Sequence, residues 1–337
     1  MSHSDQQPRT PLAVLGAGAW GTALAIRAAC AGTPVRLWGR DTAALQAMAL
    51  SAENSSYLPK VRLPSAITPS TDLGLALRDV SDVLIAVPSA GFIETLELVG
   101  EHVSNPRIAW ACKGLERDTG RLLSEVVAAR FGSQVPLACV SGPTFALEVA
   151  AGLPTAVVVG STDAQFARNL SSKLHQACFR VYTSADLIGV QLGGAAKNVL
   201  AIAAGISDGL GFGANARAAL IARGLAEMMR LGLAYGARVE TLQGLAGLGD
   251  LVLTCTDDQS RNRRFGLAVG AGASPSTAIS STANVVEGAN ASRDFAKLSE
   301  RLGVETPIMS SVNQIIWHQM PPRQAVAELL SRQPGTE

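Results

Sequence analysis

The sequence has few of the features that are typical of membrane proteins, nucleic-acid-binding proteins or secreted proteins. Charged residues make up only 16% of the 337 residues and the formal net charge is +1, which argues against a general nucleic-acid binder. No uninterrupted apolar run approaches about 18 residues, so no membrane span is expected. Residues 1–10 are polar and lack the apolar core of a signal peptide.

Cysteine and histidine are also scarce. The five cysteines form no C-x-x-C pair, and most lie in apolar segments, which is typical of buried free thiols in a reducing compartment. The four histidines show no metal-ligand spacing. The sequence therefore predicts a cytoplasmic protein without a metal site.

The pattern of apolar residues predicts an α/β fold in two domains. Short apolar runs alternate with helical patterns up to about residue 184, which is typical of a mostly parallel, doubly wound sheet with helices on both faces. Long stretches rich in alanine and leucine follow and predict helices. We expect a disordered tail (1–10), a Rossmann-type dinucleotide-binding domain (11–184) and an all-helical substrate and catalytic domain (185–332). The expected strands are residues 12–15, 35–38, 83–87, 108–112, 137–140, 155–159 and 179–182, and the main helices 185–207, 214–235, 292–302 and 307–319.

The first strand leads into a glycine motif. Gly16, Gly18 and Gly21 have the spacing G-x-G-x-x-G, and an alanine-rich helical pattern follows. In this context the first glycine makes a tight turn, the second leaves room for a pyrophosphate and the third lets helix and strand pack closely. The phosphates would bind free N–H groups at the helix N-terminus. The motif predicts a bound dinucleotide; a glycine-rich turn without a ligand is the alternative.

The end of the second strand indicates which dinucleotide is bound. A carboxylate at this position binds the ribose 2′-OH of NADH, and a basic residue accommodates the 2′-phosphate of NADPH. Here Arg40 comes first, and Asp41 is placed to cap the next helix. The order favours NADPH and leaves NADH open, with a solvated Arg40 as the alternative.

Two lysines stand in unusual surroundings. Lys113 follows the apolar run 108–112, at a strand end where ligands of an open sheet bind; a surface lysine is the alternative. Lys197 lies inside a predicted helix, with Gly193 and Gly194 one turn before it. This bare strip permits the approach of another element or of a substrate, and desolvation there lowers the pKa of a lysine. Lys197 is a candidate proton donor, unless it extends to solvent.

A third group of candidates follows the predicted helices. Asp250 comes after a glycine-rich turn, where it either caps a helix or orients a lysine. Ser260 is a fair helix N-cap, which places Arg261 and Asn262 in the first turn. A cation is disfavoured there unless an anion such as a phosphate is bound. A solvated basic turn is the alternative.

Together these motifs resemble bacterial NAD(P)-dependent glycerol-3-phosphate dehydrogenases over nearly the whole chain, from about Leu12 to beyond Pro307. The first motif alone is common to many dehydrogenases, whereas the set is specific. The resemblance implies a Rossmann-type domain followed by a helical domain of the 6-phosphogluconate-dehydrogenase type. The motifs that carry it are residues 16–25, 141–146, 195–199, 247–251, 260–263 and 285–288.

The resemblance also implies a reaction, the NAD(P)H-dependent reduction of dihydroxyacetone phosphate to sn-glycerol 3-phosphate for phospholipid synthesis. It implies that Lys197 is the proton donor or acceptor. Our hypothesis for the mechanism adds that Lys113 assists, that Asp250 holds a lysine in place and that Asn198 adds a hydrogen bond. The implied substrate site comprises Lys113, Gly142, Thr144, Lys197, Asp250, Ser260, Arg261 and Asn262. The implied cofactor contacts are Gly16, Gly18, Ala19, Trp20, Gly21, Arg40, Lys113, Ala146, Arg261, Val285 and Glu287.

Two positions depart from the family pattern or vary within it. Many relatives have serine where Ala19 stands, so one hydroxyl contact is lost while the backbone N–H remains. The basic residue at Arg40 varies in the family. We expect a homodimer that acts on a phosphorylated small molecule and has no nucleic-acid partner. The alternatives are a related hydroxy-acid dehydrogenase and a non-catalytic NAD(P)-binding sensor.

Overall fold

The computed structural model describes residues 10–280 and 286–331 and divides into two compact units. The first, here called the sheet unit, comprises Met1–Cys112 and Ser124–Leu187. The second, here called the helical unit, comprises Lys113–Leu123 and Ile188–Glu337. The helical unit is therefore built from two separate segments of the chain.

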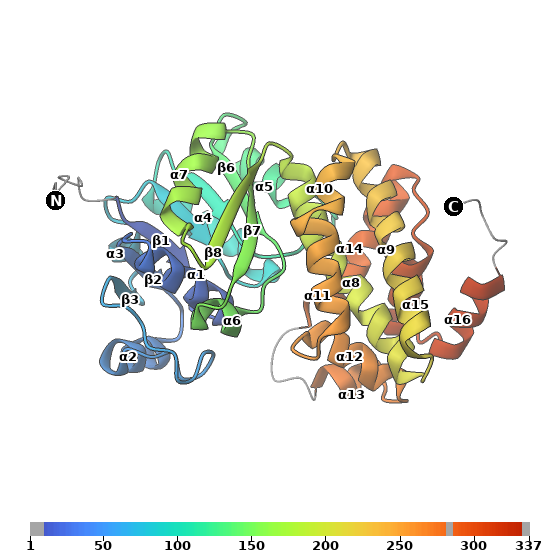
Figure 1. The fold of residues 1–337 in the computed structure, drawn as a ribbon. Coiled ribbons are helices and arrows are strands. Elements are labelled where there is room, and N and C mark those ends of the chain that lie inside the picture. Colours follow the sequence, from blue (N-terminus) through green and yellow to red (C-terminus); the bar gives the residue numbers. More distant parts are fainter. Residues whose placement is uncertain (1–9, 281–285, 332–337) are drawn as a thin grey trace. The chain divides into compact units, whose positions relative to one another are not determined.

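The sheet unit contains one eight-stranded sheet in the order β3-β2-β1-β4-β5-β6-β7-β8 (Figure 1). Neighbouring strands are parallel except β6 and β7, which are antiparallel. The glycine motif follows β1, which lies between β2 and β4 in the sheet. The strands are β1 (Leu12–Leu15), β2 (Val35–Trp38), β3 (Ile67–Ser70), β4 (Asp82–Ile85), β5 (Arg107–Trp110), β6 (Leu137–Ser141), β7 (Thr155–Gly160) and β8 (Phe179–Ser184).

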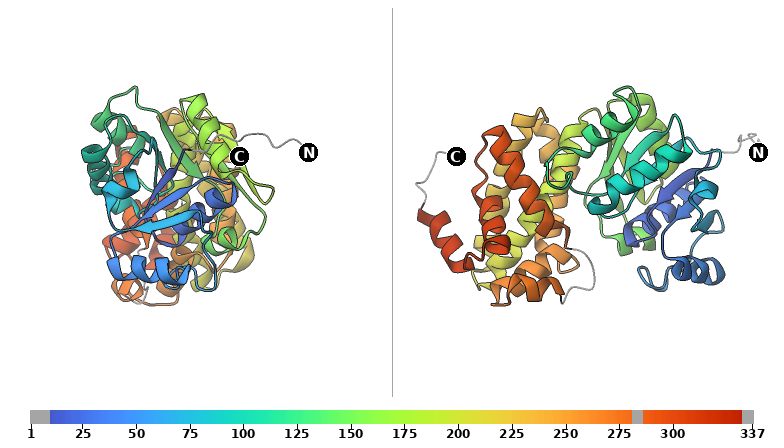
Figure 2. Two further views of the ribbon diagram at one scale, coloured as in Figure 1. Left: turned by 90° about the vertical axis from the view of Figure 1, so that its left-hand side faces the viewer. Right: turned by 180° about the vertical axis from the view of Figure 1, so that it is seen from behind.

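Helices cover both faces of this sheet, as the opposite views of Figures 1 and 2 show. Since both faces are covered, every residue of β1 is buried, and the strand reads as a continuous apolar run. The doubly wound architecture predicted from the sequence is confirmed. The helices are α1 (Ala19–Cys30), α2 (Thr42–Ser51), α3 (Leu73–Leu77), η1 (Ser89–Gly91), α4 (Phe92–His102), α5 (Leu123–Phe131), α6 (Ala146–Ala151) and α7 (Ala164–Leu174).

The edge strand β3 is absent from the strands predicted above. Its sequence, Ile67-Thr68-Pro69-Ser70, is short, half polar and contains a proline. Proline cannot donate a hydrogen bond to a neighbouring strand, and it is tolerated at a sheet edge, where one side of the strand has no partner. β3 pairs only with β2, so Pro69 is compatible with this position.

The described elements of the helical unit are helices (Figure 1). The four main helices predicted from the sequence are present as α8, α9, α14 and α15; the first turn of α14 lies before the predicted start. The elements are α8 (Leu187–Gly209), α9 (Gly213–Tyr235), α10 (Val239–Gln243), η2 (Leu245–Gly249), α11 (Asp250–Thr256), α12 (Arg261–Gly270), α13 (Pro275–Ser280), α14 (Glu287–Leu302), α15 (Pro307–Trp317) and α16 (Pro322–Ser331).

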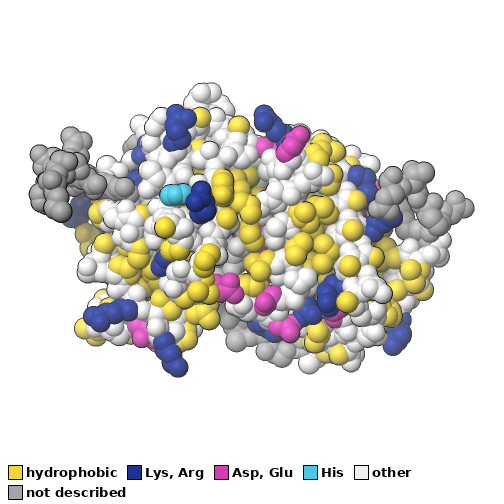
Figure 3. Space-filling view, in the orientation of Figure 1, with side chains coloured by type: hydrophobic (Ala, Val, Ile, Leu, Met, Phe, Trp, Pro, Cys, Tyr) yellow, Lys and Arg dark blue, Asp and Glu magenta, His cyan; other side chains and the backbone are white. Residues whose placement is uncertain are grey.

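Helix α8 is the core helix of its unit. Among the described residues it is the one helix that is long and apolar enough to cross a membrane by length and composition. However, 94% of its apolar window is buried inside the protein, as expected of a core helix. On the face drawn in Figure 3, Lys and Arg side chains are scattered among apolar and acidic ones, in keeping with the net charge of +1.

Glycines bring α8 and α12 into backbone contact. A Cβ added at Gly205 on α8 would lie 2.1 Å from the carbonyl oxygen of Arg263, and one added at Gly266 on α12 would lie 2.1 Å from that of Ile202. Neither space can hold a side chain, because real Cβ atoms do not approach other atoms so closely. This close crossing places the N-terminus of α12 next to the middle of α8.

Candidate active site

Lys197 lies at the centre of a cluster of charged side chains in the helical unit. It projects from α8 and is only 6% exposed. One turn earlier on the same helix, a Cβ added at Gly193 would lie 2.5 Å from the carbonyl oxygen of Ala246. The helix face without side chains that the sequence predicted around Gly193 therefore packs against η2. This contact places the first residue of α11 next to Lys197.

Asp250 joins two lysines. It is the first residue of α11, directly after the π-helical turn η2, and it is fully buried. Its Oδ1 accepts a hydrogen bond from Nζ of Lys197 at 2.6 Å, and its Oδ2 accepts one from Nζ of Lys113 at 2.5 Å. Each carboxylate oxygen thus binds one ammonium group. We call Lys113, Lys197 and Asp250 the lysine–aspartate cluster.

Thr254 completes the surroundings of the Lys197 ammonium. Its hydroxyl donates to the main-chain oxygen of Asp250 at 2.6 Å, so its lone pair is free to accept from Nζ of Lys197 at 2.8 Å. An ammonium has three N–H donors, and two of them are used by Asp250 and Thr254. The third has no acceptor among the described residues, so it is the one available to a substrate oxygen.

Burial and charge adjust the acidity of Lys197. Its pKa is lowered from 10.5 to about 8, chiefly because burial disfavours the ammonium; the positive charge of Lys113 acts in the same direction, and Asp250 opposes both. When all three groups are ionised, the cluster carries one net positive charge. Such a site stabilises an oxyanion, and a proton donor with a pKa near neutrality is suited to general acid catalysis.

The start of α12 offers a site for an anion. Ser260 caps the helix, because its hydroxyl accepts from the backbone N–H of Arg263 at 3.2 Å. The Arg263 side chain is buried and bound to Asp208 at 2.6 Å. Arg261 is exposed and has no acceptor among the described residues. Arg261 and the free N–H groups of the first turn are therefore available to bind a phosphate.

Asn262 links this turn to the lysine–aspartate cluster through hydrogen bonds. It is buried; its Nδ2 donates to Oδ1 of Asn198 at 2.9 Å, and its Oδ1 accepts from the backbone N–H of Gly288 at 2.9 Å. Nδ2 of Asn198 donates in turn to the main-chain oxygen of Lys113 at 3.4 Å. One chain of hydrogen bonds thus joins α12, α8, the first turn of α14 and the segment that carries Lys113.

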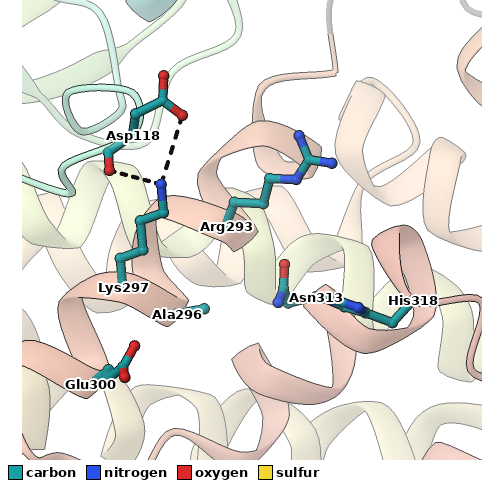
Figure 4. Close-up of a pocket in the computed structure, with 7 residues that line it drawn as sticks. All are labelled: Asp118, Arg293, Ala296, Lys297, Glu300, Asn313 and His318. Carbon is teal, nitrogen blue, oxygen red and sulfur yellow. Dashed lines mark hydrogen bonds and ion pairs between the residues drawn. The ribbon is translucent and has the colours of Figure 1, made fainter.

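The segment Lys113–Leu123 is also anchored on α14. Figure 4 shows Lys297 reaching Asp118, whose main-chain oxygen lies 2.7 Å from Nζ and whose carboxylate lies 3.7 Å from it. A cavity of about 410 Å³ lies beside this contact, lined by Asp118, Arg293, Ala296, Lys297, Glu300, Asn313 and His318. The lysine–aspartate cluster does not line this cavity, so the two are separate features of the helical unit.

The glycine turn of the sheet unit has the shape of a dinucleotide site. Gly16 has a φ of +125°, and a Cβ added at Gly21 would lie 1.9 Å from the carbonyl oxygen of Gly16, so the turn itself requires both. Gly18 has an ordinary φ of −74°, and an added Cβ would have no heavy atom within 4 Å. No side chain caps the N-terminus of α1 beside it. The turn therefore fits a pyrophosphate, which needs open space and free N–H groups.

Other predicted contacts lie near the carboxyl ends of the strands of the same sheet. Trp20, which follows Ala19 in the first turn of α1, donates from Nε1 to the main-chain oxygen of Ala111 at 3.1 Å, just after β5. Asp41 caps α2 by accepting from the N–H of Ala44 at 3.0 Å. The capping role weighed for Asp41 is confirmed, which leaves Arg40 as the charged residue next to the end of β2.

A further turn follows β6. Gly142 has a φ of +147°, and an added Cβ would lie 3.0 Å from the main-chain oxygen of Ala156. Thr144 donates from its hydroxyl to the main-chain oxygen of Gly142 at 3.2 Å, and Ala146 is the first residue of α6. The predicted residues Gly142, Thr144 and Ala146 thus share one strand-to-helix turn.

Family models match both halves of the chain. The model described as NAD-dependent glycerol-3-phosphate dehydrogenase N-terminus matches residues 11–167, and the corresponding C-terminus model matches residues 186–327. The chain belongs to the NAD-dependent glycerol-3-phosphate dehydrogenase family. The resemblance stated from the sequence is confirmed.

Individual relatives in the glycerol-3-phosphate dehydrogenase family are similar over nearly their full length. A glycerol-3-phosphate dehydrogenase [NAD(P)+] from Nitrosococcus oceani is 54% identical over 96% of this chain and 94% of its own. One from Idiomarina loihiensis is 52% identical over 98% of this chain and 100% of its own. A crystal structure of glycerol-3-phosphate dehydrogenase from Coxiella burnetii superposes with a TM-score of 0.92 at 48% identity, covering 96% of this chain and 99% of that one.

Within this family member, the helical unit brings together several residues predicted from the sequence. Lys113, Lys197 and Asp250 are in direct contact, and the alternative of Asp250 as a helix cap is wrong, because Gly249 occupies the N-cap of α11. The N-cap predicted at Ser260 is confirmed. Glu287 is the first residue of α14, and Val285 lies outside the described residues.

Sequence reasoning missed Thr254. A single threonine in the apolar run after Asp250 has no motif of its own. The available signal was its spacing, since a residue four positions after Asp250 lies on the same face of a helix. Among residues 10–280 and 286–331, no group of three or more His, Cys, Asp or Glu side chains is placed to hold a metal ion. The positive charge of this site comes from its lysines.

Proposed function

We propose that this chain reduces dihydroxyacetone phosphate to sn-glycerol 3-phosphate, with NADPH or NADH as the cofactor, and that Lys197 donates the proton. Family membership and relatives at 50–54% identity support the activity. The product is a precursor of glycerophospholipids, so the enzyme contributes to phospholipid synthesis. The observation that carries the role of Lys197 is its third N–H, held beside a buried carboxylate and a second lysine.

The geometry of the cluster supports this proton transfer. The nicotinamide cofactor, when bound, supplies a hydride to the ketone carbon, and negative charge develops on the ketone oxygen. Lys197 donates a proton to this oxygen while Asp250 and Thr254 fix the direction of its remaining N–H bonds. Lys113 adds a second positive charge next to the same carboxylate. A preorganised charge of this kind stabilises the developing oxyanion without reorganisation.

The substrate phosphate is proposed to bind at the start of α12. Arg261 provides an exposed guanidinium, Ser260 caps the helix by accepting from the N–H of Arg263, and the backbone N–H groups of Arg261 and Asn262 lie at the positive end of the helix dipole. The side chain of Asn262 is engaged with Asn198 and Gly288, so this residue contributes its backbone N–H and holds the turn in place. Binding energy from the phosphate, away from the reacting carbon, then serves to position the ketone.

The cofactor is proposed to bind the glycine turn through Gly16, Gly18, Ala19, Trp20 and Gly21. Arg40 is proposed to face the adenosine ribose, which favours NADPH because a guanidinium binds a 2′-phosphate. The further cofactor contacts proposed are Lys113, Ala146, Arg261, Val285 and Glu287, and the further substrate contacts are Gly142 and Thr144.

A cytoplasmic homodimer is proposed for the active form. The described structure leaves its five cysteines as free thiols, which suits a reducing compartment. The apolar helical unit exposes apolar side chains at both ends of α9, Phe212 at 41% and Leu233 at 50%. Light scattering after size-exclusion chromatography gives the mass directly, and a monomer at micromolar concentration contradicts the dimer.

The role of Lys197 is tested with Lys197→Met, assayed by the loss of NADPH absorbance with dihydroxyacetone phosphate. We expect kcat to fall by about 10²–10⁴-fold, the usual contribution of a general acid, with the Kd of NADPH unchanged within twofold. Lys60→Met, at an exposed lysine of the sheet unit, is the matched control and retains activity. Turnover of Lys197→Met near the unmodified rate contradicts the assignment.

The alternatives make different predictions in the same assays. A hydroxy-acid dehydrogenase prefers a carboxylate substrate to dihydroxyacetone phosphate. A non-catalytic sensor binds NADPH without turnover of any substrate. A panel of ketones with and without phosphate, assayed on the unmodified enzyme, separates all three.

A further inference from the structure

An ion pair spans the two strands that flank the glycine turn. Arg40 follows β2, and Glu94 stands in the first turn of α4, which follows β4. Nη1 of Arg40 donates to Oε2 of Glu94 at 3.0 Å. In the sheet order β2-β1-β4, the turn after β1 lies between these two strands. The pair is therefore formed next to the proposed site of the adenosine half of the cofactor.

The Arg40–Glu94 ion pair contributes little to the stability of the fold. Both side chains are largely exposed, 68% for Arg40 and 63% for Glu94. Exposed ion pairs contribute little to the free energy of folding, because water and salt screen them and two long side chains lose freedom. Glu94 stands in the first turn of α4, at the positive end of the helix dipole. A negative charge next to Arg40 therefore has a larger effect on the affinity of Arg40 for an anionic ligand than on the stability of the fold.

We propose that Glu94 determines cofactor specificity by competing with the 2′-phosphate of NADPH for Arg40. The inference rests on the proposed placement of Arg40 at the adenosine ribose. A guanidinium binds a phosphate best through two parallel N–H bonds, and Glu94 already occupies Nη1. The 2′-phosphate must either displace this carboxylate or bind through Nε and Nη2, where the neighbouring carboxylate still repels it. The neutral 2′-OH of NADH meets neither obstacle.

The consequence is a site that tolerates both cofactors. Arg40 without a partner would select strongly for NADPH, because its charge would be offered in full to the 2′-phosphate. A carboxylate in place of Arg40 would select for NADH. The Arg40–Glu94 pair lies between these cases, since the charge on Arg40 is partly neutralised but still within reach. Glu94 thereby narrows the difference in affinity between NADPH and NADH.

The test is Glu94→Gln, which removes the charge and keeps the size of the side chain. The Kd of NADPH and of NADH is measured by titration calorimetry without substrate, so that the readout is binding and not turnover. We expect the Kd of NADPH to fall by about 3- to 10-fold at low salt and that of NADH to change less than about twofold. The gain shrinks as ionic strength rises, because the effect is electrostatic.

Glu97→Gln is the matched control. Glu97 stands on the same helix and pairs with Arg130 at 2.7 Å, not with Arg40, so its substitution changes the net charge equally without touching the proposed site. If Glu94→Gln changes the NADPH-to-NADH affinity ratio no more than Glu97→Gln does, the inference is overturned.

Arg40→Ala separates this inference from the placement on which it rests. We expect it to raise the Kd of NADPH while leaving that of NADH nearly unchanged, and to reduce the gain from Glu94→Gln in the double variant. An unchanged affinity ratio in Arg40→Ala overturns the placement of Arg40 itself. A changed ratio in Arg40→Ala together with an inert Glu94→Gln overturns only the role of Glu94.

Discussion

In the sheet unit, Gly18, the glycine proposed to lie against the pyrophosphate, faces open space, whereas in the helical unit Gly193 and Gly205 on α8 face the backbone of a neighbouring element. No heavy atom lies within 4 Å of a Cβ added at Gly18. A Cβ added at Gly193 or Gly205 would lie 2.5 Å or 2.1 Å from a carbonyl oxygen of a neighbouring element. A missing side chain thus leaves open space in one unit, where we propose that a ligand binds, and lets two elements pack closely in the other. Substitution of glycine is therefore expected to weaken binding at Gly18 and to destabilise the fold at Gly193 or Gly205.

The largest effect is expected from Gly18→Val. A branched side chain at this position fills the space proposed for the pyrophosphate, so the Kd of NADPH should rise by at least about 100-fold, which corresponds to about 2.7 kcal/mol. The fold should persist, because the side chain meets no protein atom. Fluorescence titration gives the Kd, and circular dichroism gives the melting temperature. Gly18→Ala should raise the Kd in the same way to a smaller degree. If Gly18→Val binds NADPH as tightly as the unmodified enzyme, Gly18 does not leave room for the pyrophosphate.

The second effect is expected from Gly205→Ala. The added methyl group would collide with the carbonyl of Arg263, and overpacking of this kind typically destabilises a protein by about 1–3 kcal/mol. Urea unfolding followed by circular dichroism measures this loss. The control is Gly100→Ala on α4, where the nearest atom is the flexible end of the Arg130 side chain, so little destabilisation is expected. Equal stability of the two variants is the result that contradicts close packing at Gly205.

The smallest effect is expected from pH, and it distinguishes chemistry in the helical unit from binding in the sheet unit. The proposed proton donor Lys197 must be protonated to act, so kcat/KM for ketone reduction should fall as the pH rises through its pKa of about 8. Oxidation of glycerol 3-phosphate needs the neutral amine and should rise over the same range. At pH values away from the pKa, kcat/KM approaches a tenfold change per pH unit in each direction of the reaction. A flat profile between pH 7 and 9 argues against Lys197 as the titrating group.

The sheet unit could be predicted from the sequence in most respects, because its signals are local. The strands β1 and β2 have the predicted bounds, and the functions of Gly16 and Gly21 follow from residues within one turn of them. The exception is β3, whose residues, including Pro69, carry no strand signal. Its position at the sheet edge depends on pairing with β2, which a linear pattern does not contain.

The helical unit could be predicted only in part, because its site depends on contacts between distant residues. Lys197 and Asp250 were identified one by one, but their contact requires η2 to approach Gly193. The hydrogen bonds of Asn262 to Asn198 and Gly288 join three helices and have no signature in the local sequence. The resemblance to a family supplied the grouping that the physical reading of single residues did not.

The two-segment origin of the helical unit has a consequence for how the protein is made. Lys113 leaves the ribosome 137 residues before its partner Asp250. At typical rates of synthesis this interval lasts on the order of 10–30 s. During that time the Lys113–Leu123 segment has neither the carboxylate of Asp250 nor the α14 helix that later anchors it. The lysine–aspartate cluster is therefore assembled late, so that a nascent or truncated chain holds the glycine turn long before it holds the proposed active site.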